Sequence, residues 1–259
     1  MAFTIELDGR KALVTGAGQG VGRGIARALA SAGAHVVVND FVAERAETVA
    51  AEIAAEGGVA EPIAFDVTDY EAVMAAVRAL GPFDILVNNA GNAGTEGFNF
   101  APFAESEPAD WERYFGVNLY GVMHCTRAVL PGMIERAEGR VVTIVSDAGR
   151  WGEPYLGAYA AAKAGAAALT RALAREVGRH GITLNNIALG SIDSSEDAAT
   201  RELTGEAAER HKKQMRSYII RRFGRPDDIA GLVTFLASPM SSWITGQTYP
   251  VNGGYTVNQ

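Results

Sequence analysis

Short β-branched runs alternate with longer amphipathic segments along this 259-residue chain, and this alternation constrains the fold more than any other feature. Runs such as ALVTG and HVVVN are apolar on both faces, as a parallel strand covered by helices must be. The predicted strands are Lys11–Thr15, His35–Asn39, Val59–Phe65, Phe83–Asn88, Arg140–Ser146, Ile182–Leu189 and Thr248–Val251. The predicted helices are Val21–Ala32, Val42–Glu56, Tyr70–Leu80, Pro108–Arg136, Ala158–Arg179 and Asp227–Ala237. This pattern predicts an α/β fold with a doubly wound parallel sheet.

The length and composition favour a single domain. Hydrophobic residues make up 48% of the chain and charged residues 20%, which is enough apolar material for one large core. We find no internal repeat or linker, so residues 1–259 are expected to fold as one unit. The polar segment 191–222 interrupts the alternation, and a long insertion of this kind predicts a lid over a site.

Charge and cysteine content limit the partners that we expect. With 23 Lys+Arg against 30 Asp+Glu the net charge is −7, which disfavours binding to nucleic acid or to an anionic membrane. The single cysteine, Cys125, can form neither an intrachain disulfide nor a cysteine-based zinc site, which favours a reducing compartment. The N-terminus does not resemble a signal peptide, and the uncharged stretch Ile229–Gln259 is too rich in Gly, Pro and polar residues for a membrane span. We therefore expect a cytoplasmic protein without nucleic-acid or membrane partners.

The segment Thr15–Gly22, TGAGQGVG, joins the first predicted strand to the first predicted helix. Glycines at a helix N-terminus let backbone N–H groups approach a phosphate, so this turn predicts a dinucleotide site. The spacing is T-G-x-x-x-G-x-G rather than G-x-G-x-x-G, because position 21 is Val; a tight turn without a ligand is the alternative. The candidate cofactor-binding residues here are Gly16, Gln19, Gly20, Val21 and Gly22.

Asp40 follows the second predicted strand, 20 residues beyond Gly20. A carboxylate at this place accepts hydrogen bonds from ribose hydroxyls and repels a 2′-phosphate, and Gln19 supplies no compensating positive charge. We therefore predict NAD in preference to NADP, although Arg45 in the next helix opposes that preference. Asp40 could equally cap the helix that starts near Val42, and the two roles are compatible.

Further motifs resemble, in order and spacing, the single-domain short-chain dehydrogenase/reductase family over about residues 8–254. They are TGAGQGVG, Asn88-Asn89-Ala90-Gly91, Asn118, Ser146, Tyr159-x-x-x-Lys163, FGRPDDIA, ITGQ and VNGG. The resemblance implies a Rossmann-type seven-stranded sheet and hydride transfer between NAD(P) and a secondary alcohol or ketone. It does not imply a metal, and His35, His124, His180 and His211 show no ligand spacing.

The resemblance also assigns cofactor contacts. Asp66 is expected to receive the adenine amino group beside the Val67 backbone, with a helix-capping role before Asp69 as the alternative. Asn88, Ala90 and Gly91 are expected along the adenosine ribose, and Gly190, Ile192 and Ser194 beside the nicotinamide. Ala188-Leu189-Gly190 stands where the family usually has a proline, and Ser194 where it usually has a threonine.

The catalytic residues are Tyr159, Lys163, Ser146 and Asn118. Tyr159 and Lys163 are four residues apart and share one face of a helix. A free tyrosine has a pKa near ~10, and an adjacent ammonium is expected to lower that pKa toward the working range of an acid/base. Ser146, at a strand end, can polarise a substrate carbonyl. By similarity, Asn118 kinks its helix and holds a water that relays the proton to Lys163.

The substrate is the least determined feature. Seven basic residues and no acid lie between Arg210 and Arg225, and the run Ser146–Arg150 resembles that of hydroxyacyl-CoA dehydrogenases within the family. We therefore expect a 3-oxoacyl or 3-hydroxyacyl thioester, drawn to a positive site entrance. An uncharged polyol, steroid or cyclic alcohol is the alternative; a cofactor-sensing protein without turnover is disfavoured by the intact catalytic set. Aromatic residues expected near the pocket are Phe98, Phe100, Phe103, Trp151 and Tyr218.

Assembly is predicted from the alanine-rich segment Ala158–Arg179. Small side chains let helices approach closely, and members of the family commonly pair this helix and Pro108–Arg136 between subunits. We expect a homotetramer, with a dimer or packing of this helix on its own sheet alone as the alternatives.

Overall fold

The computed structural model describes residues 4–91, 102–195 and 204–257. Its centre is one seven-stranded sheet of order β3-β2-β1-β4-β5-β6-β7, in which every neighbouring pair is parallel. The strands are β1 (Lys11–Val14), β2 (His35–Asp40), β3 (Val59–Ala64), β4 (Ile85–Asn88), β5 (Gly139–Ser146), β6 (Ile182–Leu189) and β7 (Thr248–Val251). This confirms the predicted α/β class, the doubly wound parallel sheet and the seven strands.

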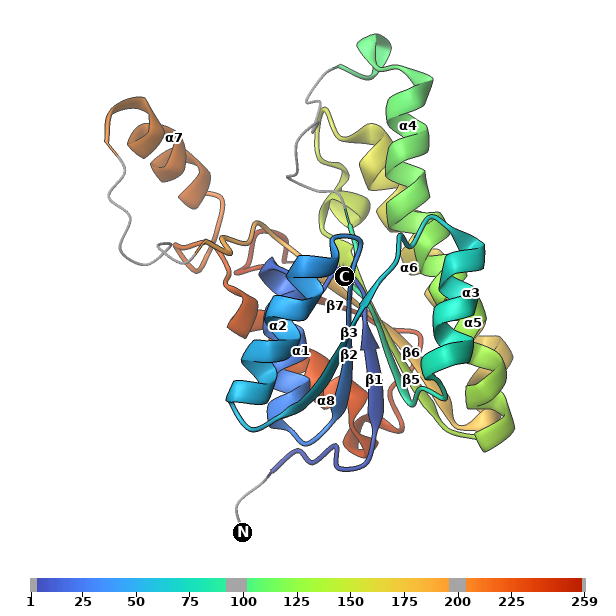
Figure 1. Cartoon of the computed structure of the whole chain (residues 1–259). Helices are drawn as coiled ribbons and strands as arrows, with labels where there is room; N and C mark the ends of the chain where they lie inside the picture. Colours follow the sequence, from blue (N-terminus) through green and yellow to red (C-terminus); the bar gives the residue numbers. More distant parts are fainter. Residues whose placement is uncertain (1–3, 92–101, 196–203, 258–259) are drawn as a thin grey trace.

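Helices cover both faces of the sheet (Figure 1). On one face α1 packs against α8 and α2 lies beside them; on the other α3 packs against α5, with α6 against β5 and β6. α7 projects away from the sheet. The helices are α1 (Gly20–Ser31), α2 (Ala43–Ala55), α3 (Tyr70–Leu80), α4 (Pro108–Phe115), α5 (Gly121–Arg136), α6 (Gly157–Val177), α7 (Gly205–Met215) and α8 (Pro226–Ala237).

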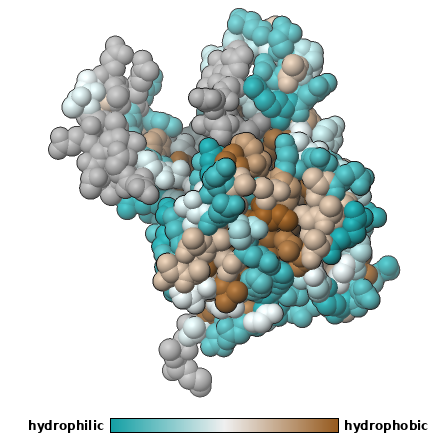
Figure 2. Space-filling view, viewed as in Figure 1, coloured by the Kyte–Doolittle hydropathy of each residue, from teal (hydrophilic) through white to brown (hydrophobic). Residues whose placement is uncertain are grey.

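Strand β2 shows why both-face apolar runs make this architecture. Val36 and Val38 belong to the core cluster under α1, α2 and α8, whereas Val37 belongs to the cluster under α3 and α5. Each of these side chains is fully buried, which favours folding by about 1.5–3 kcal/mol per valine-sized side chain. The edge strand β3 is different, because it carries Pro62, which offers no N–H to a further strand. The apolar surface beside β3 is bordered by hydrophilic side chains (Figure 2).

The predicted helix Pro108–Arg136 is interrupted by a π-helical turn, η2 (Gly116–Tyr120), between α4 and α5. The Asn118 amide Nδ2 donates to the carbonyl of Tyr114 at 3.0 Å, the carbonyl that a backbone N–H four residues later takes in a regular α-helix. The side chain therefore competes with the helical ladder at this point. The continuous helix predicted from the sequence was wrong here, although the break falls at the residue expected to kink it.

Within the described ranges, none of the helices combines the length and apolar character that crossing a bilayer requires.

Candidate active site

The carboxyl ends of the parallel strands bring the predicted site residues to one edge of the sheet. The glycine turn follows β1, Asn88 ends β4, and Ser146 ends β5 opposite Leu189 of β6. The strand order reverses between β1 and β4, and in doubly wound sheets ligands bind at such a switch point. Both α7 and α4 project from the sheet in the view of Figure 1.

The glycine turn is a cradle that larger side chains would fill. A Cβ on Gly22 would lie 2.3 Å from the Gly16 carbonyl oxygen and 2.4 Å from Asn89 Nδ2. Gly20 has φ +58°, and a Cβ there would lie 3.4 Å from Ser194 Oγ across the cleft. These glycines therefore keep bare backbone facing the cleft at the point where α1 begins.

The N-terminus of α1 is open to an anion. Within the described chain, its N-cap residue Gln19 makes no side-chain capping bond and its first turn has no acidic residue. The adjoining surface cleft is lined by Gly20 and Ser194, by Arg23, Arg27 and Arg225, and by Asp193 and Asp227. Arg23 and Arg27 are ion-paired with Glu52 and Glu56, so the cleft carries charges of both signs. The backbone N–H groups at the start of α1 are the feature that fits the pyrophosphate of a dinucleotide cofactor.

Asp40 is buried, and its carboxylate bonds both the glycine turn and Val42, the N-cap residue of α2. One of its oxygens, Oδ2, accepts from the Gly18 N–H at 3.2 Å, and the other, Oδ1, accepts from the Val42 N–H at the start of α2 at 3.0 Å. A Cβ on Gly18 would also lie 2.6 Å from Cβ of Arg45, so an acid and a base border the same turn. The Arg45 guanidinium lies 5.9 Å from the ring centroid of Phe41.

The residues expected around the adenosine half of the cofactor are Asp66 and Val67, after β3, and Asn88, Ala90 and Gly91, at the end of β4. Asp66 Oδ1 accepts from the Thr68 N–H at 2.8 Å, and it is Asp69 that caps α3, by accepting from the Ala72 N–H at 3.0 Å. The capping alternative considered for Asp66 was therefore wrong. The carbonyl oxygen of Val67 lies 2.9 Å from His124 Nδ1.

Asn88 is buried and turns away from the cleft, with Nδ2 donating to Thr126 Oγ1 at 3.0 Å. The Thr15 hydroxyl accepts from the N–H groups of Asn89 and Ala90, and Asn89 Nδ2 donates to the Gly16 carbonyl at 3.0 Å. Asn89 thus shapes the cradle, although sequence reasoning did not select it. Its place in the Asn88–Gly91 motif was the available signal.

Beyond β6, Gly190 packs against the C-terminal segment, since a Cβ there would lie 3.2 Å from the Asn252 backbone. Ile192 pairs with Gly224 as a parallel bridge. Ser194 faces Gly20, as described above. Gly20, on the strand β1 side, and Ser194, on the strand β6 side, thus line one cleft.

Tyr159 and Lys163 lie in the first turns of α6 and are 6% and 5% exposed. Lys163 Nζ donates to the Ile144 carbonyl at 3.0 Å and lies 5.9 Å from the ring centroid of Tyr159. Burial lowers the pKa of Lys163 to about 8. Burial raises the pKa of Tyr159 to about 12, opposed by its hydrogen bond with Ser146. The ammonium therefore does not offset the burial of the phenol in this structure.

Ser146 and Asn118 complete the group. The Ser146 hydroxyl oxygen accepts from the Ala148 N–H at 3.1 Å, and its hydrogen bond with Tyr159 links strand β5 to helix α6. Asn118 is fully buried, and both its Oδ1 and Lys163 Nζ border Gly91, at 3.1 and 3.4 Å from a Cβ built there. The four predicted catalytic residues therefore come together near Gly91, whose neighbour Ala90 packs against Gly16 of the glycine turn.

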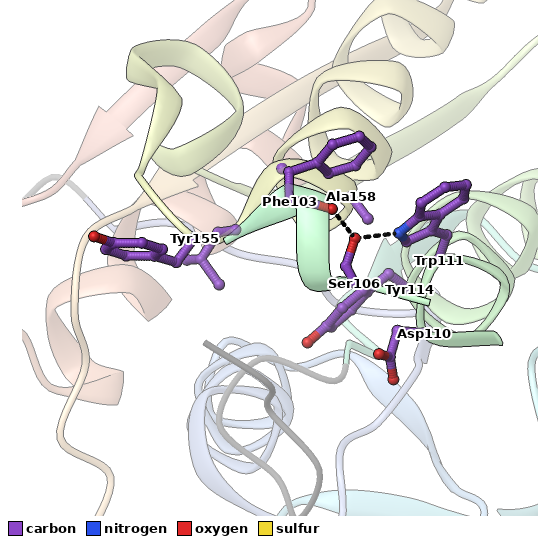
Figure 3. Close-up of a pocket in the computed structure, with 9 residues that line it drawn as sticks. Phe103, Ser106, Asp110, Trp111, Tyr114, Tyr155 and Ala158 are labelled. Atoms are coloured by element: carbon purple, nitrogen blue, oxygen red, sulfur yellow. Dashed lines mark hydrogen bonds between the residues drawn. The ribbon is translucent and has the colours of Figure 1, made fainter. Parts of the chain in front are cut away.

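An aromatic pocket lies between α4 and α6, near Tyr159 (Figure 3). Phe103 stacks on Trp111 with ring centroids 5.3 Å apart, and Trp111 Nε1 donates to Ser106 Oγ at 2.8 Å. Tyr114 lines this pocket and also packs edge-on against Tyr159, 6.1 Å away. Phe103, expected at the substrate mouth, thus supports the start of α6; Phe98 and Phe100 lie outside the described residues.

The described part of the predicted lid contains α7 and a buried Tyr218. The Tyr218 hydroxyl accepts from the Ser191 N–H at 2.9 Å, and its ring lies 5.1 Å from that of Tyr255. Tyr218 is therefore buried against Tyr255 of the C-terminal segment. It supports the lid and is not an exposed wall of the pocket. Trp151 is 64% exposed.

The basic residues of this region differ in their pairing. Arg222 binds Asp228 through two hydrogen bonds of 2.6 and 2.7 Å, and this bond lowers the pKa of Asp228 to about 2. Lys212 lies 3.9 Å from Glu209. Lys213, Arg216, Arg221 and Arg225 are exposed, and the side chain of Arg210 lies outside the described set. In the part of the chain that the structure describes, no three His, Cys, Asp or Glu side chains are grouped to hold a metal ion.

Comparisons with known proteins agree with this geometry. The family model described as enoyl-(acyl carrier protein) reductase matches residues 16–256. The 7alpha-hydroxysteroid dehydrogenase of Escherichia coli (strain K12) is 38% identical over 254 residues, covering 96% of this chain and 95% of that protein.

Two solved structures are similar over almost the whole chain. A gluconate 5-dehydrogenase from Burkholderia cenocepacia J2315, in complex with NADP and tartrate, matches with a TM-score of 0.88 and 37% identity, covering 98% of each chain. A 3-oxoacyl-[acyl-carrier protein] reductase from Brucella melitensis, with bound NAD, matches with a TM-score of 0.88 and 34% identity, covering 98% of this chain and 94% of that one. These relatives differ in the substrates and cofactors that their names give.

Proposed function

Because the chain belongs to the short-chain dehydrogenase/reductase family, whose members here act on CH–OH groups, we propose that Tyr159, Lys163, Ser146 and Asn118 catalyse alcohol–ketone interconversion with NAD(H). The observation that carries this proposal is the hydrogen bond between Ser146 and Tyr159 beside the glycine cradle. A binding module would need the cradle but not this pair. NADH oxidation with a panel of ketones tests the proposal, and no turnover with any carbonyl class would remove it.

The residues have separate tasks. When bound, the nicotinamide ring supplies or accepts the hydride. Tyr159 donates the phenolic proton to the carbonyl oxygen during reduction, and Ser146 donates a hydrogen bond to the same oxygen. The Ser146 hydroxyl can do so because its oxygen already accepts from the Ala148 N–H, which leaves its own proton available. Lys163 and Asn118, with Gly91 between them, would carry the proton that replaces the one given up by Tyr159.

We propose NAD as the preferred cofactor, on the position of Asp40. Its carboxylate borders the glycine turn through the Gly18 N–H, where it would repel a 2′-phosphate. Arg45 borders the same turn and weakens that repulsion. Solved relatives with NADP and with NAD are both known, so this choice depends on the chain's own residues.

For the substrate we propose a 3-oxoacyl or 3-hydroxyacyl thioester. Of the exposed cations, Lys213 lies in the last turn of α7 and Arg216 directly follows that helix, and neither has an acidic partner among the described residues. Phosphate groups of coenzyme A or of an acyl carrier would be attracted there. The relative named for a hydroxysteroid supports an uncharged alcohol (a polyol, steroid or cyclic alcohol) as the second candidate.

We further propose a homotetramer. Helix α5 exposes Met123 and Ile134, and Tyr120 precedes it in the π-helical turn; all three are large and at least 37% exposed. An apolar helix face of this kind favours a second copy of the chain as its partner. Light scattering at micromolar concentration is the test, and a monomer there would contradict the proposal.

A further inference from the structure

A buried carboxylate directly follows the catalytic serine. Asp147 is 2% exposed, and both of its oxygens accept hydrogen bonds. Oδ1 accepts from Arg150 at 2.7 Å, whereas Oδ2 accepts from Asn252 Nδ2 at 2.5 Å and from Thr256 Oγ1 at 3.0 Å. A carboxylate at such depth is stable only when it is satisfied in this way, because each lost partner leaves a desolvated charge.

Two of these partners come from the far end of the chain. Asn252 and Thr256 lie after β7, and Asn252 Nδ2 also donates to the Thr256 carbonyl and hydroxyl oxygens, at 3.0 Å each. We call Asp147, Arg150, Asn252 and Thr256 the C-terminal clasp. The clasp joins Asp147 to Asn252 and Thr256, which lie 105 and 109 positions later in the sequence.

The same C-terminal segment reaches the lid base. The Tyr255 hydroxyl donates to Glu153 at 2.7 Å, and the Tyr255 ring packs on Tyr218. The Ile220 N–H donates to the Gly253 carbonyl at 2.8 Å. Residues 252–256 therefore lie between the turn after Ser146 and the segment 218–220 that follows α7.

The clasp fixes the residue on which the Ser146 geometry depends. The Asp147 N–H donates to the Leu189 carbonyl at 3.0 Å, so residue 147 is held by both its backbone and its side chain. The next N–H, that of Ala148, is the donor to the Ser146 hydroxyl. A shift of residue 147 would move this donor and with it the direction of the serine proton.

We propose that Asp147 is a positioning residue for Ser146, and that Asn252 and Thr256 make the C-terminal segment part of the active site by holding Asp147. The kinetic side of this inference rests on the proposed function. The structural side does not, because the turn and its hydrogen bonds exist without substrate.

Two variants test the clasp. In the wild-type protein both carboxylate oxygens of Asp147 accept from N–H or O–H groups. Asp147→Asn keeps the shape of the side chain but places an NH2 group against one of these donors. Thr256→Val is nearly isosteric and removes one donor to Asp147, so it is the milder change. The matched control is Arg140→Lys, which disturbs buried bonds to Gly139, Gly181 and Ser238 at the opposite end of the same strand β5.

Each variant is measured in three ways: kcat and KM for ketone reduction, the Kd of NADH, and amide hydrogen exchange of the peptide covering residues 144–150. We expect Asp147→Asn to lower kcat about tenfold and Thr256→Val about threefold, a fraction of the effect of removing a carbonyl hydrogen bond outright. We expect NADH Kd to stay within about twofold, and exchange of the 144–150 peptide to speed up in both variants but not in Arg140→Lys.

The outcomes separate the two proposals. Unchanged kcat in folded Asp147→Asn, or a lower kcat with unchanged exchange of residues 144–150, would overturn the positioning role. An effect of equal size in Arg140→Lys would overturn it too. If Asp147→Asn does not fold, Thr256→Val decides by the same criteria. If the wild-type protein reduces no carbonyl compound, the proposed function fails, and the exchange measurement still decides whether the clasp holds the Ser146 turn.

Discussion

Lys163 Nζ donates to the Ile144 carbonyl at 3.0 Å, two residues before Ser146 on the same strand. The bond ties the base of α6 to the carboxyl end of β5, so the relative positions of Tyr159 and Ser146 depend on it. It also holds the ammonium to the backbone, 5.9 Å from the phenol ring centroid, in a site where its pKa falls to about 8. Lys163 can therefore gain or lose its proton near neutral pH.

Replacing Tyr159 by Phe should abolish turnover and preserve cofactor binding. The change removes the hydroxyl bonded to Ser146 and leaves the packing of the ring against Tyr114. Positioned acid–base groups contribute roughly 10²–10⁴ in rate, so we expect kcat to fall by about that factor, with NADH Kd within about twofold. Steady-state kinetics and fluorescence titration measure the two. Tyr70→Phe, on a half-exposed ring at the start of α3, is the control. Activity of Tyr159→Phe near the wild-type level would remove the assigned mechanism.

The two directions of the reaction should respond oppositely to pH. Tyr159, with a pKa raised to about 12, stays protonated and able to act as an acid throughout the neutral range, and Lys163 is charged only below about pH 8. We therefore expect ketone reduction to be constant below pH 7 and to fall above about pH 8. Alcohol oxidation, which needs the phenolate form of Tyr159 to accept the alcohol proton, should keep rising with pH.

Profiles of kcat in both directions check this expectation. Lys163→Arg keeps its charge above pH 8, so its reduction profile should lose the fall near that pH. A fall retained in the arginine variant would assign it to another group.

Adding one methyl group to the cradle should be enough to block the cofactor. A Cβ on Gly22 would collide with Gly16 O and Asn89 Nδ2, both backbone-anchored neighbours at 2.3–2.4 Å. We expect Gly22→Ala to raise the Kd of NADH at least about tenfold, since loss of close backbone approach removes phosphate contacts. Gly231→Ala in α8, where no atom lies within 4 Å of the built Cβ, is the matched control and should gain about 0.5–1 kcal/mol of stability. Equal NADH affinity for the two variants would show that this turn does not hold the cofactor.

The sequence was sufficient for the sheet, and the catalytic candidates that it selected lie together in the structure; the reasons are local. Strands such as β2 are apolar on both faces, and the motifs around Tyr159 and Asn88 have fixed spacing. The break at Gly116–Tyr120 was not predicted as a π-helical turn, because it depends on the Asn118 amide competing for a single carbonyl.

Long-range partners account for most of what was missed. Tyr218 was expected on a pocket wall, and its burial comes from Tyr255 and Phe223 packing around it. Asp147 was read only as part of the Ser146–Arg150 run, because Asn252 and Thr256 are supplied by the last strand's extension. The one local signal was Arg150, three residues after Asp147.

Cofactor preference should depend on the carboxylate of Asp40. Asp40→Ser removes the charge that borders the glycine turn while Arg45 remains, so we expect NADPH affinity to rise at least about tenfold and NADH affinity to fall. Fluorescence titration of both reduced cofactors on the wild type and the variant gives the four constants. Tighter binding of NADPH than of NADH to the wild-type protein would contradict the preference for NAD.

A thioester substrate should be held by the exposed cations Lys213 and Arg216 at the end of α7, and its binding should therefore depend on salt. Charges on the surface are screened within about 8 Å at physiological ionic strength, so KM for a 3-oxoacyl-CoA should rise several-fold between about 0.05 and 0.5 M salt, whereas KM for an uncharged ketone should not. Lys213→Glu and Arg216→Glu should raise the thioester KM by about threefold to tenfold each, because each places a negative charge where phosphates would approach. Arg222→Gln is the matched control: Arg222 is already neutralised by two bonds to Asp228, so its loss should change the thioester KM by less than about twofold. If salt and the two charge reversals leave the thioester KM unchanged while uncharged ketones are reduced faster, the substrate is an uncharged alcohol or ketone and the basic segment is only a solvated surface.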